Sequence, residues 1–325
     1  MSAIGPQTAP VPVQPGEYDA IVGKPRSLWR DAWSRLGKRP LVLACAAILG
    51  IYLLLGAIGF TGVLDEPMTA SIGGSNQPPS FYKPGTKEIN PGFWFGTDFL
   101  GRSVFWRLIY GVRVALTVAL LASLIEITIG IVLGSLAGFF GGKIDAFIVW
   151  LFSTVASVPW ILLMVAFAYV LKDQTFFGRP LAGIPTIVLA LGLTTWVGLC
   201  RLIRAEVLKH RNRDYVAAAR ALGLSEARII FRHILPNVFH LVIINFALVL
   251  AGFVHAEVIL SFLGLGVTDV PSWGRMIDDA KLELLKGVWW QMLVATVAIF
   301  VFSLAINIFG DALRDALDPR LRGVD

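Results

Sequence analysis

Residues 204–237 read RAEVLKHRNRDYVAAARALGLSEARIIFRHILPN and connect two long apolar stretches, at 184–203 and 238–263. Connections between neighbouring helices usually need only about two to eight residues. This connector is much longer, and its basic, alanine-rich and apolar parts follow one another in a regular pattern. We therefore expect the connector to have a function beyond joining the two stretches.

The middle of the connector has the pattern of two helices joined by a sharp corner. Asp214 suits an N-cap position, and good helix formers follow it. Gly223 suits the left-handed residue that ends a helix, and Ser225 can cap a second helix over 226–235. Pro236 is expected to end that second helix or to turn it toward the membrane.

One face of the first helix carries small residues between two larger ones. At helical spacing this face presents Tyr215, Ala218, Ala219 and Leu222. Alanines leave the backbone open to close approach by another surface, and the two larger side chains can anchor it. The same face can equally pack against the protein's own helix ends, and the residues alone leave both alternatives open.

The rest of the chain has the composition of a membrane protein. Of 325 residues, 56% are hydrophobic and 15% are charged, whereas charged residues make up about 25% of a soluble domain. A spanning helix needs about 20 mostly apolar residues, and this is met at 41–60, 112–140, 146–171, 184–203, 238–263 and 288–310. The sequence therefore predicts an all-α integral membrane protein with six transmembrane helices, the third kinked at Pro159.

Lys and Arg residues are concentrated on one side of these predicted helices. The segments before 40, at 141–145, at 201–237 and after 310 together hold 18 of them, and the segments on the other face hold 10. Because cytoplasmic loops are enriched in Lys and Arg, we expect both termini in the cytoplasm. The net charge of +6 then follows from membrane topology, and no nucleic-acid partner is expected.

The chain divides into three regions. Residues 1–25 contain five prolines and no periodic apolar pattern, so they are predicted to be a disordered cytoplasmic tail. Residues 26–39 place two Trp and a Leu on one helical face, which predicts an amphipathic helix on the membrane surface. Residues 40–325 then form the transmembrane domain, which includes the connector at 204–237.

The sequence lacks the common patterns of catalytic and metal sites. It contains no Gly-x-x-x-x-Gly-Lys-Ser/Thr phosphate loop and no Gly-x-Ser-x-Gly nucleophile turn. Its four histidines show no paired metal-ligand spacing, and both cysteines lie inside apolar stretches. We therefore expect no catalytic residues, no metal and no cofactor in this chain.

The connector resembles the cytoplasmic signature of ABC importer permeases: Glu-Ala-Ala, three residues, Gly, nine residues, then Ile-x-Leu-Pro. The signature is matched at Ala218, Ala219, Gly223, Leu235 and Pro236. Two positions depart from it, with Ala217 in place of the initial Glu and His233 in place of the Ile. The second departure is frequent in the peptide branch, whose loops often read Arg-His-Ile-Leu-Pro-Asn.

Other segments are similar to the dipeptide, oligopeptide and nickel permeases. Residues 96–102, GTDFLGR, resemble a Gly-Thr-Asp-x-x-Gly-Arg box, although Ser103 replaces the Asp that usually follows. We expect Thr97 and Asp98 to cap an amphipathic helix along 99–110 on the outer surface. The set is completed by LSFLGLG at 260–266, PSWG at 271–274 and DPRLR at 318–322. The chain is identified as a member of the C-type permeases of peptide/nickel importers, over about residues 26–322.

The resemblance implies the type I ABC importer permease fold with a cytoplasmic coupling helix, in the bacterial inner membrane. The implied partners are a homologous sister permease, two ABC ATPases that bind ATP and Mg, and an extracytoplasmic peptide-binding protein. The residues expected to contact or shape the ATPase docking element are Asp214, Tyr215, Ala218, Ala219, Leu222, Gly223, Leu235 and Pro236.

The implied cargo is a peptide, with nickel or another small solute as the alternative within the family. A secondary transporter or channel driven by an ion gradient is the competing class, but it leaves the patterned connector unexplained. An intramembrane enzyme would need converging polar residues, which the sequence does not show.

Two further sets of residues stand out within the apolar stretches. Gly130, Gly134 and Gly138 allow close helix contact, either as packing within the subunit or as a sliding contact during gating. A buried acid at the bilayer centre costs roughly 2.5–3.5 kcal/mol, so Glu126 and Glu257 need protein or water around them. Glu257 can line the translocation path and meet a peptide amino group, or it can bond backbone near the glycine-rich run.

Overall fold

The computed structural model describes residues 36–83, 85, 88–176, 178–267 and 269–317. The predicted tail at 1–25, most of the predicted surface helix at 26–39 and the motif at 318–322 lie outside these residues.

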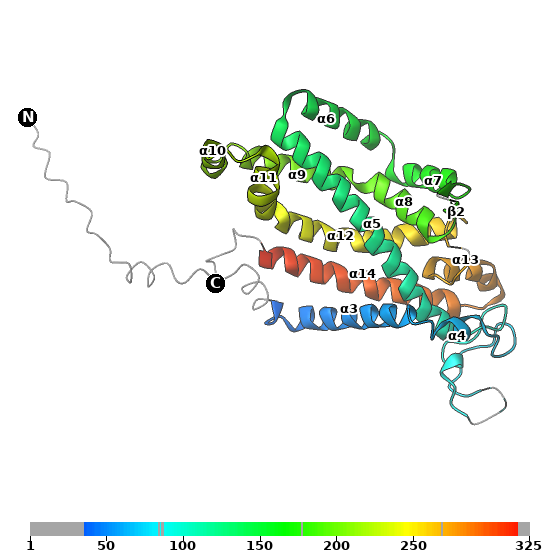
Figure 1. Ribbon diagram of the computed structural model, residues 1–325. Coiled ribbons are helices and arrows are strands. Elements are labelled where there is room, and N and C mark those ends of the chain that lie inside the picture. The colour runs from blue at the N-terminus through cyan, green and yellow to red at the C-terminus, as the bar shows by residue number, and fades with distance from the viewer. Residues whose placement is uncertain (1–35, 84, 86–87, 177, 268, 318–325) are drawn as a thin grey trace, which may run out of the picture.

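The described chain is almost entirely helical (Figure 1). The apolar helices are α3 (Pro40–Gly59), α5 (Val104–Phe140), α6 (Gly142–Ala156), α7 (Trp160–Leu171), α8 (Ile184–Thr195), α9 (Val197–His210), α12 (Leu235–Phe262) and α14 (Trp290–Leu317). The shorter helices are α4 (Asp65–Thr69), η1 (Pro91–Phe93), α10 (Asp214–Ala221), α11 (Glu226–Ile229), the π-helical turn η2 (Ile230–Ile234), α13 (Trp273–Glu283) and η3 (Leu284–Lys286). Strands β1 (Thr175–Phe176) and β2 (Arg179–Pro180) form a small antiparallel hairpin.

Five helical segments are long and apolar enough to cross a membrane: Pro40–Gly59, Val104–Phe140, Ile184–His210, Glu226–Phe262 and Trp290–Leu317. The pair α6 and α7 passes the same test together, but it is bent by 89° at its break. With this pair counted as one span the described residues hold six spans, so the predicted all-α membrane fold is confirmed. The kink predicted at Pro159 is a complete break, because α6 ends before it and α7 begins after it.

The second span begins earlier than the apolar pattern indicates. The predicted surface helix at 99–110 is wrong: α5 starts at Val104 and runs without interruption into the membrane. Its cap is Ser103, whose Oγ accepts a hydrogen bond from the Trp106 amide at 3.2 Å. Thr97 and Asp98 instead belong to the folded loop before the helix.

Of the two outcomes expected for the helix after the Gly223 corner, an end at Pro236 does not occur. The helix continues from Glu226 to Phe262 as one apolar segment. The π-helical turn η2 lies directly before α12, whose second residue is Pro236. A proline inside a regular helix would clash with the preceding turn. The wider π turn gives its ring room, so the helix continues.

Helix α5 is the centre of the fold and crosses α12, α8 and α9 diagonally (Figure 1). The half of α5 that begins at Val104 lies in the largest apolar core, together with residues of α8, α12 and α14. A second core lies at one end of the molecule, where α9, α10, α11 and η2 meet the last turn of α5. In Figure 1 this end carries α10 and α11, and the opposite end carries α4 and α13.

Candidate functional site

The connector forms the short helix α10 at the end of the molecule. The prediction that Asp214 caps this helix is wrong: Arg213 holds the cap position, and its side chain makes no capping hydrogen bond. Asp214 is the first helical residue. A carboxylate in the first turn still interacts favourably with the positive end of the helix dipole.

The corner after α10 has the predicted left-handed glycine. Gly223 has a φ of +75°. Its amide donates to the Arg220 carbonyl at 2.9 Å, and the Leu224 amide donates to the Ala219 carbonyl at 3.2 Å. This pair of bonds is the Schellman closure, which requires a left-handed residue that glycine adopts without steric cost. The corner therefore fixes the direction in which the chain leaves α10.

One face of α10 packs against the protein itself. Val216 and Ala219 are buried in the second core, among side chains of α5, α9 and α11. Tyr215 is half-buried, and its hydroxyl lies 2.9 Å from Nδ1 of His210. Burial raises the pKa of the Tyr215 hydroxyl above its ordinary value.

The other face of α10 is open to solvent. Its exposed residues, with the two that follow the helix, are Asp214, Ala217, Ala218, Arg220, Ala221, Leu222 and Gly223. Leu222 is 81% exposed, so its apolar side chain is available for contact with another surface. The residues predicted to share one docking face are therefore divided: Ala219 and Tyr215 face inward, whereas Ala218 and Leu222 face outward. Packing against the protein's own helices therefore holds for the inward face, and the outward face stays open to another surface.

The last two residues of the signature lie away from α10. Leu235 and Pro236 begin α12, where Leu235 is half-buried against the second core and Pro236 is exposed. Together with η2 they shape the way α12 enters the membrane.

Three arginines attach the connector and α9 to the turn between α5 and α6, a set of contacts that no sequence motif indicated. Arg211 donates from Nη1 to the Phe139 carbonyl at 3.1 Å, and the Arg220 guanidinium lies 5.2 Å from the centre of the Phe139 ring. Arg204 holds Asp145 through two hydrogen bonds, of which the Nη2–Oδ2 bond is 2.7 Å. Two-point arginine contacts of this kind fix orientation as well as charge.

The three glycines of α5 lie against α9. A Cβ atom at Gly134 would lie 2.7 Å from the Cys200 carbonyl oxygen, and one at Gly138 would lie 2.7 Å from that of Arg204. A Cβ atom at Gly130 would meet the Leu199 side chain at 2.9 Å. The stripe therefore brings two backbones within direct contact inside this subunit.

At the opposite end, the box at 96–102 forms a compact polar loop. Asp98 is fully buried, and its Oδ1 accepts from the amides of Leu100 and Arg102 at 2.9 and 2.8 Å. The Thr97 hydroxyl donates to the Gly74 carbonyl, and the Trp290 indole donates to the Thr97 carbonyl at 3.0 Å. The box thus holds the loop before α5 against α14.

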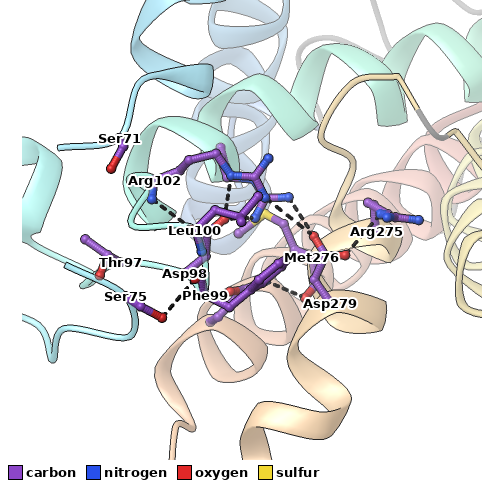
Figure 2. Close-up of polar contacts among 12 residues, drawn as sticks. Ser71, Ser75, Thr97, Asp98, Phe99, Leu100, Arg102, Arg275, Met276 and Asp279 are labelled. Carbon is purple, nitrogen blue, oxygen red and sulfur yellow. Dashed lines mark hydrogen bonds and ion pairs between the residues drawn. The ribbon is translucent and has the colours of Figure 1, made fainter. Parts of the chain in front are cut away.

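An ion-pair network extends from this loop to α13 (Figure 2). Arg107 is 3% exposed and bridges two acids, with Nη1 2.6 Å from Asp98 and Nη2 2.9 Å from Asp279. Arg275 contacts Asp279 from the solvent side at 3.1 Å. Nearby, a hydrogen bond with Lys286 lowers the pKa of Glu283, which also accepts from Asn76. The network joins segments that are far apart in the sequence.

The two intramembrane acids are enclosed by this subunit. Glu257 is fully buried; the Ser261 hydroxyl donates to its Oε1 at 2.7 Å, and Ser272 and the backbone of Gly274 face the same carboxyl. In this conformation it lies off any exposed surface, which does not fit the path-lining alternative. Glu126 accepts from the Asn245 amide at 3.0 Å and so ties α5 to α12.

Comparison with known proteins identifies the class of membrane protein. A sequence profile of the family described as "Binding-protein-dependent transport system inner membrane component" matches residues 130–323. The chain belongs to this family. The matched region contains the glycine stripe, the connector and helices α12 to α14. As a member with several apolar spans, the chain is a multi-pass permease subunit of the inner membrane.

Named relatives of this permease family cover almost the whole chain. The dipeptide transport system permease protein DppC of Bacillus subtilis (strain 168) is 35% identical over 94% of this chain and 90% of the relative. The oligopeptide transport system permease protein OppC of the same organism is 31% identical over 96% of each. A solved inward-facing structure of the MetNI methionine ABC transporter is similar with a TM-score of 0.49 and 18% identity, over 66% of this chain and 98% of that chain.

Proposed function

We propose that this chain forms one half of the translocation pore of an ATP-driven importer of peptides. The other half is a homologous sister permease, two ABC ATPases supply the energy, and an extracytoplasmic binding protein delivers the peptide. The chain itself has no ATPase site and holds no cofactor; ATP and Mg are bound by the ATPases. Peptide cargo is supported by the relatives, which are named as dipeptide and oligopeptide permeases.

The observation that carries this proposal is the division of α10 into a buried and an exposed face. The exposed alanines and Leu222 offer a small apolar surface to an ATPase. The buried face, with Val216 and Ala219, joins that surface firmly to the protein's own core. A force applied to α10 therefore reaches the membrane helices without being absorbed by a flexible loop.

Transmission follows from the contacts of the connector. Helix α9 leads directly into α10, and the Gly223 corner leads through α11 and η2 into α12. Arg211 also bonds the Phe139 carbonyl at the end of α5, and Arg220 contacts the Phe139 ring. When ATP draws the ATPases together, α10 moves as a rigid unit, and the spans attached to it alternate the pore between the two sides of the membrane.

Copurification tests the assembly. The tagged chain is extracted in mild detergent from its native host, and the associated proteins are identified by mass spectrometry. Recovery of two ATPases and a sister permease is expected. Recovery of this chain alone would contradict the proposal.

Reconstitution tests the energy source. Proteoliposomes that contain the purified complex and the binding protein should accumulate a labelled dipeptide with ATP and fail to do so with a nonhydrolysable analogue. Uptake that depends on an ion gradient and is indifferent to ATP would support a secondary transporter instead.

A further inference from the structure

Polar side chains from two neighbouring helices, α12 and α14, lie together at the surface of the membrane region. His255 of α12 is exposed, and its Nε2 lies 3.2 Å from the Ser303 hydroxyl of α14. Asn307, one turn along α14, is also exposed and donates to the Ser303 carbonyl at 2.8 Å. Gly252, one turn before His255, is exposed and has no atom within 4 Å of where a Cβ would be. We call this set the His255 face.

The His255 face lies within the apolar thickness of a membrane. At 1.5 Å per residue, Ser303 lies about 20 Å along α14 from its first residue, Trp290, and Trp290 bonds the outer loop. By the same rise, His255 lies about 10 Å before the outer end of α12, at Phe262. The hydrocarbon core of a bilayer is about 30 Å thick, so both side chains fall inside it.

An ionisable side chain at this depth does not face lipid. Histidines in membrane spans face a bundle interior or a water-filled cavity, because an imidazole exposed to hydrocarbon loses its hydrogen bonds with water. The outward surface of α3 shows the contrast. Its large exposed residues are all apolar, namely Leu41, Leu43, Ile51, Leu53, Leu54 and Ile58.

We propose that the His255 face lines the water-filled part of the translocation path, where His255 forms hydrogen bonds with the polar backbone of a passing peptide. This inference rests on the proposed function, since it assumes that the chain forms half of a pore. Imidazole suits the task because one ring nitrogen donates while the other accepts. Ser303 orients the ring through Nε2, and Nδ1 is left for the peptide. The open space at Gly252 leaves room for it.

Cysteine accessibility in the assembled complex tests the location. Both native cysteines of this chain are buried, so labelling of this subunit within the complex reports on the new cysteine. We expect His255→Cys to react with a charged, water-soluble thiol reagent at least about tenfold faster than Leu54→Cys, because only a hydrated thiol ionises readily. An excess of dipeptide should slow the reaction at position 255. Equal rates for the two variants would overturn the proposal. Labelling of the isolated chain but not of the complex would also overturn it, because a helix of the sister permease would then cover the site.

Transport measurements separate a peptide contact from a structural role. His255→Gln keeps a side chain that donates and accepts and should change the KM for dipeptide less than threefold. His255→Leu should raise that KM about tenfold or more, the loss of one hydrogen bond to a polar substrate. Ser303→Ala should give an intermediate effect. An unchanged KM in His255→Leu would refute the contact.

The outcomes also distinguish this inference from the proposed function. ATP-dependent dipeptide uptake with an unreactive His255→Cys would leave the importer intact and reject the His255 face as its path. Uptake that is indifferent to ATP, with a reactive and dipeptide-protected cysteine, would reject the ATP-driven importer and retain the path.

Discussion

Gly223 is the residue at which backbone conformation and proposed function meet most directly. Its φ of +75° is left-handed, and no neighbouring atom restricts a side chain there. A substitution therefore changes the backbone preference and little else. An L-residue in this conformation costs roughly 1–2 kcal/mol, more when it is β-branched, whereas asparagine tolerates it.

Replacement of Gly223 should uncouple transport according to the backbone preference of the new residue. Gly223→Val is expected to lower the dipeptides transported per ATP several-fold, because the corner opens and α10 no longer moves with α12. Gly223→Asn should stay close to the unsubstituted protein. Parallel uptake and ATPase assays in proteoliposomes measure the ratio. Normal coupling in Gly223→Val would contradict rigid transmission through the corner.

Leu222 should contribute to ATPase binding and little to folding. At 81% exposure its replacement by Asp is expected to change the free energy of unfolding by no more than about 0.5 kcal/mol. A charge in a desolvated contact should weaken ATPase binding at least about tenfold, or about 1.4 kcal/mol. Titration of the detergent-solubilised subunit with purified ATPase gives the affinity. Leu282→Asp, a similarly exposed leucine on α13, is the control and should bind normally.

The predictability of single residues depended on how local their role is. The role of Gly223 was predictable because a helix stop is encoded by one residue and its neighbours. Asp214 was misplaced by one position, since the choice between cap and first helical residue depends on how Arg213 approaches. His255 was missed because its position on the exposed face, beside Ser303, exists only once α12 and α14 have packed.

At the scale of helices, the close contact that the glycine stripe predicted is the one between α5 and α9. Gly134→Ala should destabilise the protein by about 1–3 kcal/mol, because the new methyl group would press on the Cys200 carbonyl and the Ile203 side chain. A Cβ atom at Gly198, on α9, would meet no atom within 4 Å. Gly198→Ala should therefore be neutral or slightly stabilising. Thermal unfolding in one detergent compares them. Equal midpoints would mean that the two helices separate easily.

Helix ends were less predictable than helix cores, for a physical reason. The apolar pattern placed the second span at 112–140, whereas α5 begins at Val104. The additional turns contain Arg107, whose charge is offset by Asp98 and Asp279. A short window of sequence around Arg107 contains its charge but does not contain Asp279, which lies far away in the chain. In the same way, the π turn before Pro236 depends on packing in the second core.

At the scale of the whole molecule, the Arg107 network joins the loop before α5 to the helix before α14. Removal of a buried ion-pair partner is expected to cost about 3–5 kcal/mol, since it leaves buried charge uncompensated. Arg107→Met should therefore lower the unfolding midpoint strongly. Arg275→Met removes a partly exposed partner of the same Asp279 and should cost less than about 1 kcal/mol. Similar losses in the two variants would argue that the network is hydrated and weak.

The bent pair of α6 and α7 decides the topology of the whole chain. If the pair crosses the membrane as one span, the chain has six spans and its termini share a side; if it re-enters, there are five spans and the termini lie on opposite sides. Each half is too short to cross alone, because a span needs about 20 residues. The excess of Lys and Arg on the side of both termini favours a crossing.

Impermeant thiol labelling of intact cells can locate both ends of the pair. Cysteine at Thr175, in the hairpin after α7, should be labelled from outside, as should the outer-loop control Ser80→Cys. Cysteine at Lys143, at the start of α6, should be labelled only after the cells are opened, like the connector control Ala218→Cys. If positions 143 and 175 react from the same side, α6 and α7 form a re-entrant loop. The connector and the C-terminus would still share one side, because α12 and α14 both cross between them, so with α10 facing the ATPases the N-terminus would lie outside.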